Sequence, residues 1–180
     1  RCISPARHCQ IAELSAIFSF CGEIQRTEEG QTFLCFSTEN ESVIRKCFTL
    51  LQKTFKIDRE ISIDKRLIKR NNRFVIEVRG QEDTVRILQA AKYLTADRQP
   101  MPCAALVNPL VIQKNCCRRA FLRGAFLCAG SISDPEKFYH FEIVCSTLSK
   151  AQQLQELVQS FEVDAKVVSR KKHEVVYVKE

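Results

Sequence analysis

Several features that mark membrane proteins and common enzyme classes are missing from this sequence. No apolar run approaches the roughly 18 residues that a membrane span needs, so no transmembrane helix is predicted. Five glycines form neither a G-x-G-x-x-G motif nor a Walker pattern, so there is no phosphate-binding loop. There is no C-x-x-C pair, and nothing ties a histidine to both a cysteine and an orienting acid. We therefore expect no cofactor, no zinc knuckle and no Cys/His catalysis.

Cysteine, by contrast, is abundant. The 180 residues include ten cysteines, but these are spread over a domain-sized length, and no secretion signal is visible. Cys21, Cys47 and Cys128 lie among apolar residues, where a free thiol behaves as a small hydrophobe. Since disulfide scaffolds belong mostly to short secreted chains, we expect a reduced, cytoplasmic protein.

Positive charge is concentrated in two segments. Residues 56–73 carry seven basic and three acidic side chains (+4), and residues 165–180 carry five basic and two acidic side chains (+3). These two segments account for the whole net charge of +7. A polyanion is the natural partner of such patches, although charge on exposed turns can also serve solubility alone.

The sequence contains an internal repeat. The segment HCQIAELSAIFSFCGEI (8–24) aligns with CCRRAFLRGAFLCAGSI (116–132) at an offset of 108. The alignment pairs Cys9 with Cys117, Ala12 with Ala120, Leu14 with Leu122, Phe18 with Phe126, Gly22 with Gly130 and Ile24 with Ile132. The shared residues form an apolar spine with a closing glycine, which predicts two equivalent helices.

The same order of elements follows each helix. LCFSTENES (34–42) and FEIVCSTLS (141–149) both predict a short strand that runs into a Ser/Thr/Asn-rich helix start. Each copy then ends in a predicted hairpin around a basic turn: EISI (60–63) and RFVIEV (73–78) flank DKRLIKRNN, whereas AKVV (165–168) and EVVYV (174–178) flank SRKKH. The basic hairpin tips explain the distribution of charge.

These elements predict a mixed α/β (α+β) domain that consists of two pseudosymmetric αββαββ(α) repeats. The first repeat spans residues 1–96 and includes an additional helix at 82–94. A proline-containing connector spans 97–115, and the second repeat spans 116–180. Such a duplication predicts a monomer with a pseudo-twofold axis between its halves.

The duplicated segment FLRGAFLCAGS (121–131) resembles the signature helix of the LAGLIDADG homing-endonuclease fold. The resemblance implies that two signature helices pack side by side at the pseudo-twofold axis and that each sheet forms half of a saddle for DNA. It assigns the packing of the helix pair to Leu14, Phe18, Gly22, Leu122, Gly124, Phe126 and Gly130.

In that family an acid just before the last glycine of each helix holds the divalent metal for DNA cleavage. Cys21 and Ala129 occupy these positions here. An alanine cannot ligate, and a thiol is too soft for Mg²⁺. Glu23 has Ser131 at its equivalent position, and Asp134 lies farther along, so no pair of equivalent acids is present. We therefore expect no nuclease activity, and no catalytic residue is assigned.

The wider pattern is similar to the WhiA family of bacterial regulators. The resemblance rests on CCRRAFLRGAFLCAGSISDPEKFYHFEIVCST, LCFSTENESVIRKCFTLLQKTF and the closing VVYVKE, and it covers nearly the whole chain. It implies a degenerate endonuclease domain of a cytoplasmic, nucleoid-associated transcriptional regulator involved in sporulation, cell division and chromosome segregation. It also implies a C-terminal helix-turn-helix domain, which this sequence lacks.

Two interpretations of the basic hairpins remain. In the first, DNA phosphates bind in a salt-dependent manner to Lys65, Arg66, Lys69, Arg70, Arg73, Lys166, Arg170, Lys171 and Lys172. In the second, the domain is a docking module for an acidic regulatory or division protein and does not contact DNA. Arg118, Arg119 and Arg123 have no basic counterparts in the first copy, so we expect them to face solvent or the connector.

The paired cysteines at the helix starts leave one further question. Cys9 and Cys117 are equivalent in the repeat, and His8 and Cys116 stand beside them. Symmetry could bring these residues close enough for a zinc site or a thiol pair. Because structural zinc sites usually take their ligands from spaced knuckles, packing at the helix starts is the favoured interpretation, and no metal is predicted.

Overall fold

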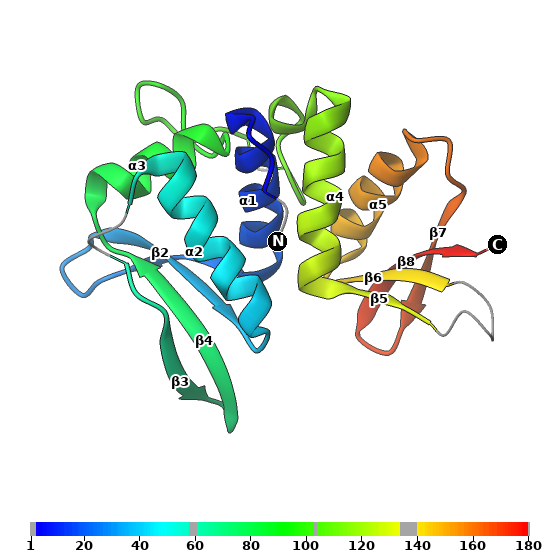
Figure 1. Cartoon of the computed structure of the whole chain (residues 1–180), viewed down its shortest axis with the longest axis horizontal. Coiled ribbons are helices and arrows are strands. Elements are labelled where there is room, and N and C mark those ends of the chain that lie inside the picture. Colours follow the sequence, from blue (N-terminus) through cyan, green and yellow to red (C-terminus); the bar gives the residue numbers. More distant parts are fainter. Residues whose placement is uncertain (1–2, 58–60, 103, 134–139, 180) are drawn as a thin grey trace.

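The structure is a computed structural model that describes residues 3–57, 61–102, 104–133 and 140–179. Within these ranges the chain forms two halves, each with helices packed on one face of a four-stranded antiparallel sheet (Figure 1). The first half contains α1 (Arg7–Cys21), β1 (Gly22–Arg26), β2 (Thr32–Thr38), α2 (Glu41–Phe55), β3 (Asp64–Ile68), β4 (Asn71–Val78) and α3 (Gln81–Ala90). After a connector with the 3-10 helix η1 (Pro109–Ile112), the second half contains α4 (Asn115–Ala129), β5 (Gly130–Ile132), β6 (His140–Cys145), α5 (Leu148–Gln159), β7 (Ala165–Arg170) and β8 (His173–Lys179).

The two sheets share one topology, which confirms the predicted fold class. Their strand orders are β1-β2-β4-β3 and β5-β6-β8-β7. The register is equivalent as well, since Gly22 of β1 pairs with Phe36 of β2 and Gly130 of β5 pairs with Ile143 of β6. In both halves the central helix therefore ends directly at the first residue of the edge strand.

Local sequence explains where the outer helices begin. Asn40 precedes α2, and its side chain accepts hydrogen bonds from the backbone N–H groups of Ser42 and Val43. Thr147 precedes α5 and accepts one from Lys150. Such N-caps satisfy backbone donors that a helix start leaves unpaired. Neither α1 nor α4 has a side-chain cap of this kind.

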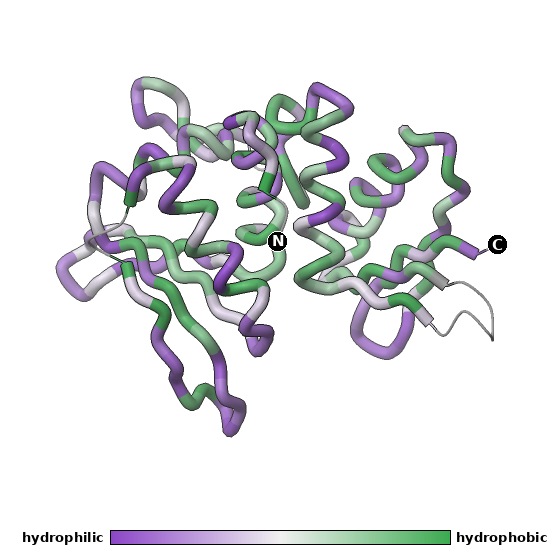
Figure 2. Tube along the Cα trace, viewed as in Figure 1, coloured by the Kyte–Doolittle hydropathy of each residue, from purple (hydrophilic) through white to green (hydrophobic). Residues whose placement is uncertain are grey.

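Two hydrophobic cores lie beneath the helices, and α1 contributes to both. Leu14 and Phe18 belong to the core of the first half, between its sheet and α2. Ala12 and Ala16, on another face of the same helix, belong to the core of the second half. Figure 2 shows apolar residues where the helices meet the sheets and hydrophilic residues at both hairpin turns. α1 is therefore the element that joins the two halves.

The first hairpin differs from its prediction. The strand is β3, Asp64–Ile68, and all five of its residues are exposed. Of the strand predicted at 60–63, residue 60 lies outside the described residues, and residues 61–63 are not in a strand. The turn is reduced to Lys69 and Arg70, which have φ values of 49° and 71°. Positive φ at both central residues is typical of a two-residue type I′ hairpin turn. Lys65 and Arg66 therefore lie in a strand. The helix predicted at 82–94 begins at Gln81 and ends at Ala90.

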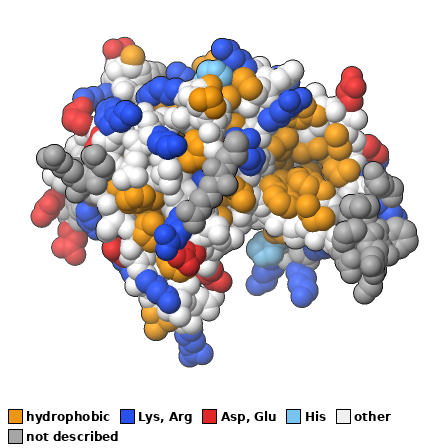
Figure 3. All heavy atoms as spheres, in the orientation of Figure 1, with side chains coloured by type: hydrophobic (Ala, Val, Ile, Leu, Met, Phe, Trp, Pro, Cys, Tyr) orange, Lys and Arg blue, Asp and Glu red, His pale blue; other side chains and the backbone are white. Residues whose placement is uncertain are grey.

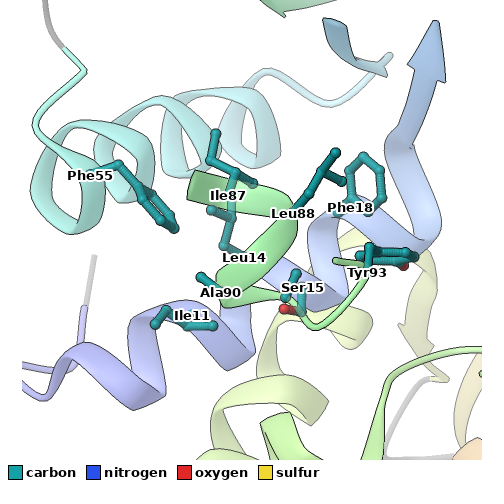
Figure 4. A pocket seen from close by; sticks show the side chains of 10 residues that line it. Ile11, Leu14, Ser15, Phe18, Phe55, Ile87, Leu88, Ala90 and Tyr93 are labelled. Atoms are coloured by element: carbon teal, nitrogen blue, oxygen red, sulfur yellow. The ribbon is translucent and has the colours of Figure 1, made fainter. Parts of the chain in front are cut away.

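One small gap remains in the first core, between α1, α2 and the segment that includes α3 (Figure 4). Apolar side chains surround it, and its volume of about 10 Å³ is barely enough for a single water molecule. The hydroxyl of Ser15 lies in this lining, fully buried and without a hydrogen-bond partner among the described residues. No helix in the described ranges is long and apolar enough to cross a membrane.

Candidate nucleic-acid interface

The tips of the two equivalent hairpins carry exposed positive charge. The β3–β4 and β7–β8 turns project away from the helices in the same general direction (Figure 1). Lys and Arg side chains lie at the ends of both hairpins (Figure 3). Lys69 and Arg70 form the first turn, and Lys171 and Lys172 form the second. All four residues are exposed.

The other two arginines of the first hairpin are held by neighbouring groups of the same sheet. Arg66 donates from Nη1 to Glu77 at 2.6 Å and from Nη2 to Asp64 at 2.9 Å. The hydrogen bond from Arg66 lowers the pKa of Glu77, so this carboxylate is charged. Arg73 donates to both the side-chain and the main-chain oxygen of Ser37, each at 2.8 Å. Their positive charges are therefore partly committed within the protein.

The strand residues of the second hairpin are paired in the same way. Lys166 Nζ lies 3.1 Å from Asp164, and Arg170 Nη1 donates to both carboxylate oxygens of Glu142 at 3.0 and 3.1 Å. Of the nine candidate cations, five make no such contact within the part of the chain that the structure describes: Lys65, Lys69, Arg70, Lys171 and Lys172. The candidate interface therefore consists of the four cations at the hairpin tips and Lys65, and no longer includes all nine.

Two hollows lie on the faces of the sheets, at corresponding places in the two halves. A groove of about 480 Å³ runs from the end of α1 to the first hairpin and includes Cys21, Gly22, Glu23, Lys69 and Arg73 in its lining. A hollow of about 350 Å³ in the second half is lined by Ser131, Ile132, Ser133, Glu142 and Arg170. Each hollow contains both acids and bases.

Among the described residues, the C-terminal ends of the central helices carry no pair of carboxylates. Cys21 is half-buried, and the neighbouring Cys128 thiol lowers its pKa. Ala129 closes α4. Glu23 is exposed, and its carboxylate accepts a hydrogen bond from Gln25. Asp134, the other acid weighed at this place, lies outside the described residues.

The central helices pack closely where one of them has a glycine. A Cβ atom on Gly124 would lie 2.8 Å from the main-chain oxygen of Glu13 and 2.9 Å from Cβ of Ala16. Gly22 and Gly130 have a different environment, since a Cβ atom there would meet the ring of Phe18 or Phe126 in the same helix. Both glycines therefore allow a phenylalanine ring to fold over the end of its own helix.

The remaining residues assigned to the helix pair face the sheets. Leu14 and Phe18 lie in the first core, whereas Leu122 and Phe126 pack against the second, where Phe126 stacks on Phe141 at 5.1 Å between ring centroids. This differs from the expected arrangement, because the helical period turns these positions toward their own sheets. α1 instead packs toward the second half through small residues such as Ala12 and Ala16.

A buried carboxylate that the sequence did not single out connects the halves. Glu13 of α1 is fully buried, and Arg123 of α4 donates to both of its oxygens at 3.0 Å. Lys46 of α2 lies 2.5 Å from the same group. Of the arginines expected to face solvent or the connector, Arg118 donates to the main-chain oxygen of Ile112 in the connector, and Arg119 stacks over Phe161.

The N-terminal ends of the same helices hold the four residues left open by the sequence. His8 and Cys9 of α1 lie against Cys116 and Cys117 of α4, and their four potential ligand atoms all lie within 4.8 Å of one another. In the described ranges this is the one group of at least three His, Cys, Asp or Glu residues close enough to share an ion.

Two adjacent central helices that each lead into an equivalent antiparallel sheet define a LAGLIDADG-like domain. The chain matches the model of the WhiA N-terminal LAGLIDADG-like domain over residues 7–93 and that of the WhiA LAGLIDADG-like domain over residues 118–180. It is 47% identical over 175 residues to the "Probable cell division protein WhiA" of Lachnoclostridium phytofermentans, covering 97% of this chain and 56% of that protein. The corresponding protein of Lachnospira eligens is 40% identical over 175 residues, covering 97% and 55%. The chain belongs to the WhiA family and spans about half the length of these relatives.

Solved structures share the fold. Full-length WhiA from Thermatoga maritima superimposes with a TM-score of 0.70 at 18% identity, over 100% of this chain and 54% of that chain. I-DmoI in complex with DNA and Mn superimposes with a TM-score of 0.63 at 10% identity, over 96% and 90%. At these levels of identity the likeness concerns the fold alone.

Proposed function

We propose that this chain is a non-catalytic DNA-associated domain of a bacterial regulator of cell division. The observation that carries the proposal is the presence of exposed cations at the tips of both hairpins in a duplicated fold. Family relatives bear the name of a cell division protein, and a structure of similar fold holds DNA. The hairpin tips would contact phosphates, which gives affinity without base discrimination.

The absence of catalysis follows from the helix ends. Cleavage of a phosphodiester with Mg²⁺ requires oxygen ligands near the scissile phosphate. The positions before the closing glycines are Cys21 and Ala129, and Glu23 has a serine as its equivalent. We therefore propose that DNA binds without being cut.

The relatives are longer than this chain, and the proposal includes a longer protein of the same kind. This domain would add backbone affinity beside a C-terminal helix-turn-helix domain that reads sequence, in a cytoplasmic, nucleoid-associated regulator of transcription. Sporulation, cell division and chromosome segregation are the processes that such a regulator would serve.

The proposal is tested by titrating the purified chain, as a monomer, against labelled duplex DNA at two salt concentrations. With about four phosphates neutralised, affinity should fall about 100-fold between 50 and 200 mM salt. The variant Lys69→Glu/Lys171→Glu should weaken binding strongly and flatten the salt dependence, because two phosphate contacts become repulsive.

A charge-matched control separates the tips from net charge. Lys53→Glu/Lys114→Glu produces the same change in total charge at exposed positions on α2 and just before α4, and should leave most of the affinity. Equal losses in both variants would contradict an interface at the tips. Cleavage of the duplex on adding Mg²⁺ would contradict the non-catalytic assignment.

A second function is favoured by the internal pairing of Arg66, Arg73, Lys166 and Arg170, which leaves less free positive charge than the sequence indicates. In this alternative the tips recruit an acidic regulatory or division protein. No binding of the unaltered chain to DNA at low salt would favour it.

A further inference from the structure

The cluster at the N-terminal ends of α1 and α4 gathers one imidazole nitrogen and three cysteine sulfurs. His8 Nδ1 lies 3.2 Å from the sulfur of Cys117, 3.3 Å from that of Cys9 and 3.9 Å from that of Cys116. A neutral imidazole nitrogen either donates or accepts, and it directs at most one N–H toward one sulfur. Hydrogen bonding therefore accounts for one of these contacts, and the other two are close approaches of sulfur to the same nitrogen.

A tetrahedral ion accounts for all of them. Zn–S bonds of about 2.3 Å and Zn–N bonds of about 2.0–2.1 Å place each sulfur about 3.6 Å from the nitrogen and about 3.8 Å from the next sulfur. The three observed nitrogen–sulfur distances lie on both sides of the expected nitrogen–sulfur distance. All pairs among the four ligand atoms lie within 4.8 Å. The four atoms are thus close enough together to become the ligands of one tetrahedral zinc ion.

The donor set selects the metal. Three thiolates and one imidazole form a Cys₃His set, which is a standard closed site for structural zinc. Thiolate ligands are too soft for Mg²⁺ or Ca²⁺. Cys9 and Cys117 are buried, whereas His8 and Cys116 are exposed. One side of the site is consequently shielded by the protein, and the other side is open for metal entry.

The helix ends suit a negatively charged set of ligands. In α1 the ligands are the second and third residues, and in α4 they are again the second and third residues. The positive end of a helix dipole stabilises thiolates at such positions. Both helices lack the side-chain caps that begin α2 and α5.

We propose that His8, Cys9, Cys116 and Cys117 bind one structural Zn²⁺ that fastens the two halves together. Each half supplies two adjacent ligands from the first turn of its central helix, and the repeat offset of 108 makes His8 equivalent to Cys116 and Cys9 to Cys117. The site lies at the ends of the helices opposite the sheets and hairpins (Figure 1). It is therefore separate from the proposed DNA interface and does not depend on it.

The direct test is the metal content of the 180-residue chain, purified in reducing buffer without a metal-affinity tag. Elemental analysis should find one zinc per chain. Replacement with Co²⁺ should give the visible absorption of tetrahedral cobalt together with a near-ultraviolet thiolate-to-cobalt band. Removal of the metal by a chelator should lower Tm by about 10 °C, the shift expected when a ligand far above its Kd is lost from a domain of this size.

Matched variants place the metal. Cys9→Ser and Cys117→Ser should lose the zinc and the cobalt bands. Cys21→Ser and Cys128→Ser, at the opposite ends of the same two helices, should keep both. His8→Cys should retain one metal and strengthen the thiolate-to-cobalt band, because it adds a fourth sulfur. This last variant tests the site even if the serine variants fail to fold.

Several results would overturn the proposal. These are a reduced chain that takes up no zinc and gives no tetrahedral cobalt spectrum, iron in place of zinc, or a disulfide between two of the three cysteines in the chain as isolated. Equal loss of cobalt absorption in Cys9→Ser and Cys21→Ser would also place the metal elsewhere.

Discussion

At the scale of single residues, positions that are equivalent in the repeat carry different chemistry. Ser15 and Arg123 are separated by the repeat offset of 108. Arg123 reaches a carboxylate of the other helix, whereas the hydroxyl of Ser15 is buried against apolar side chains without a described partner. A buried polar group that makes no hydrogen bond loses its hydration and gains nothing in return. The two equivalent side chains therefore differ in their contribution to the stability of the chain as well as in charge.

This difference predicts that Ser15→Ala stabilises the chain. Removing the unpaired hydroxyl should raise the free energy of unfolding by about 1 kcal/mol and Tm by about 2–4 °C. Ser19→Ala is the control from the same helix, and it should have the opposite sign, because the Ser19 hydroxyl donates to the main-chain oxygens of Ser15 and Leu106. Thermal unfolding of both variants provides the measurement. A destabilised Ser15→Ala would reveal a partner for this hydroxyl.

At the scale of elements, the contact between α1 and α4 depends on small residues. Gly124 of α4 lies against the backbone of α1 at Glu13 and against Ala16, its own repeat equivalent. The close approach leaves no room for a methyl group on Gly124. The spacing of the two helices is thus set by a glycine on one side and an alanine on the other.

Gly124→Ala tests this contact, because the sign of the change in the free energy of unfolding depends on it. In an exposed helix, alanine in place of glycine would stabilise by about 1 kcal/mol. Here the new methyl group would meet a main-chain oxygen, so the free energy of unfolding should instead fall by about 1–3 kcal/mol. Chemical denaturation measures the change. A rise in stability would mean that the helices can separate without cost.

The elements differ in how far the sequence could predict them. The central helices were predictable because an apolar spine and a closing glycine recur at a fixed offset. Strand β3 was misplaced, because its five residues are all exposed and show no alternation, while Lys69 and Arg70 are unusual residues for a two-residue turn. The cations of the candidate interface could be found by charge. The acids that hold Arg66 and Arg170 could not, because Glu77 and Glu142 come into reach only through the pairing of strands.

The cysteine cluster shows the same limit. Adjacent ligands such as His8 and Cys9 lack the spacing by which zinc sites are known from sequence. They become a set of four only when two helices that are more than 100 residues apart lie side by side. The repeat alignment indicated that Cys9 and Cys117 could be neighbours, but distances were needed to bring in all four residues.

At the scale of the whole molecule, Glu13 holds three helices from both halves. Its carboxylate meets Arg123 of α4 and Lys46 of α2 while fully buried. A buried charge with good partners contributes little net energy as a set, but removing one member leaves the others poorly compensated. The ion pair therefore fixes how the halves fit together more than it adds to their stability.

Glu13→Gln should consequently destabilise the chain, by about 2–3 kcal/mol. The matched control is Glu41→Gln, which removes a carboxylate from an exposed pair with Arg45 on α2 and should change stability by less than about 1 kcal/mol. Denaturant titration compares the two variants. Similar small effects in both would show that water reaches Glu13 and replaces its partners.

The position of this ion pair also bears on how a duplicated chain recognises itself. Glu13 has Phe121 as its repeat equivalent, and Arg123 has Ser15. Two first halves placed face to face would each bury a carboxylate with no guanidinium opposite, and two second halves would present guanidiniums to phenylalanines. The contact between α1 and α4 is thus complementary only between unlike halves. Each half therefore selects an unlike half, and the contact disfavours dimers formed by two first halves or by two second halves.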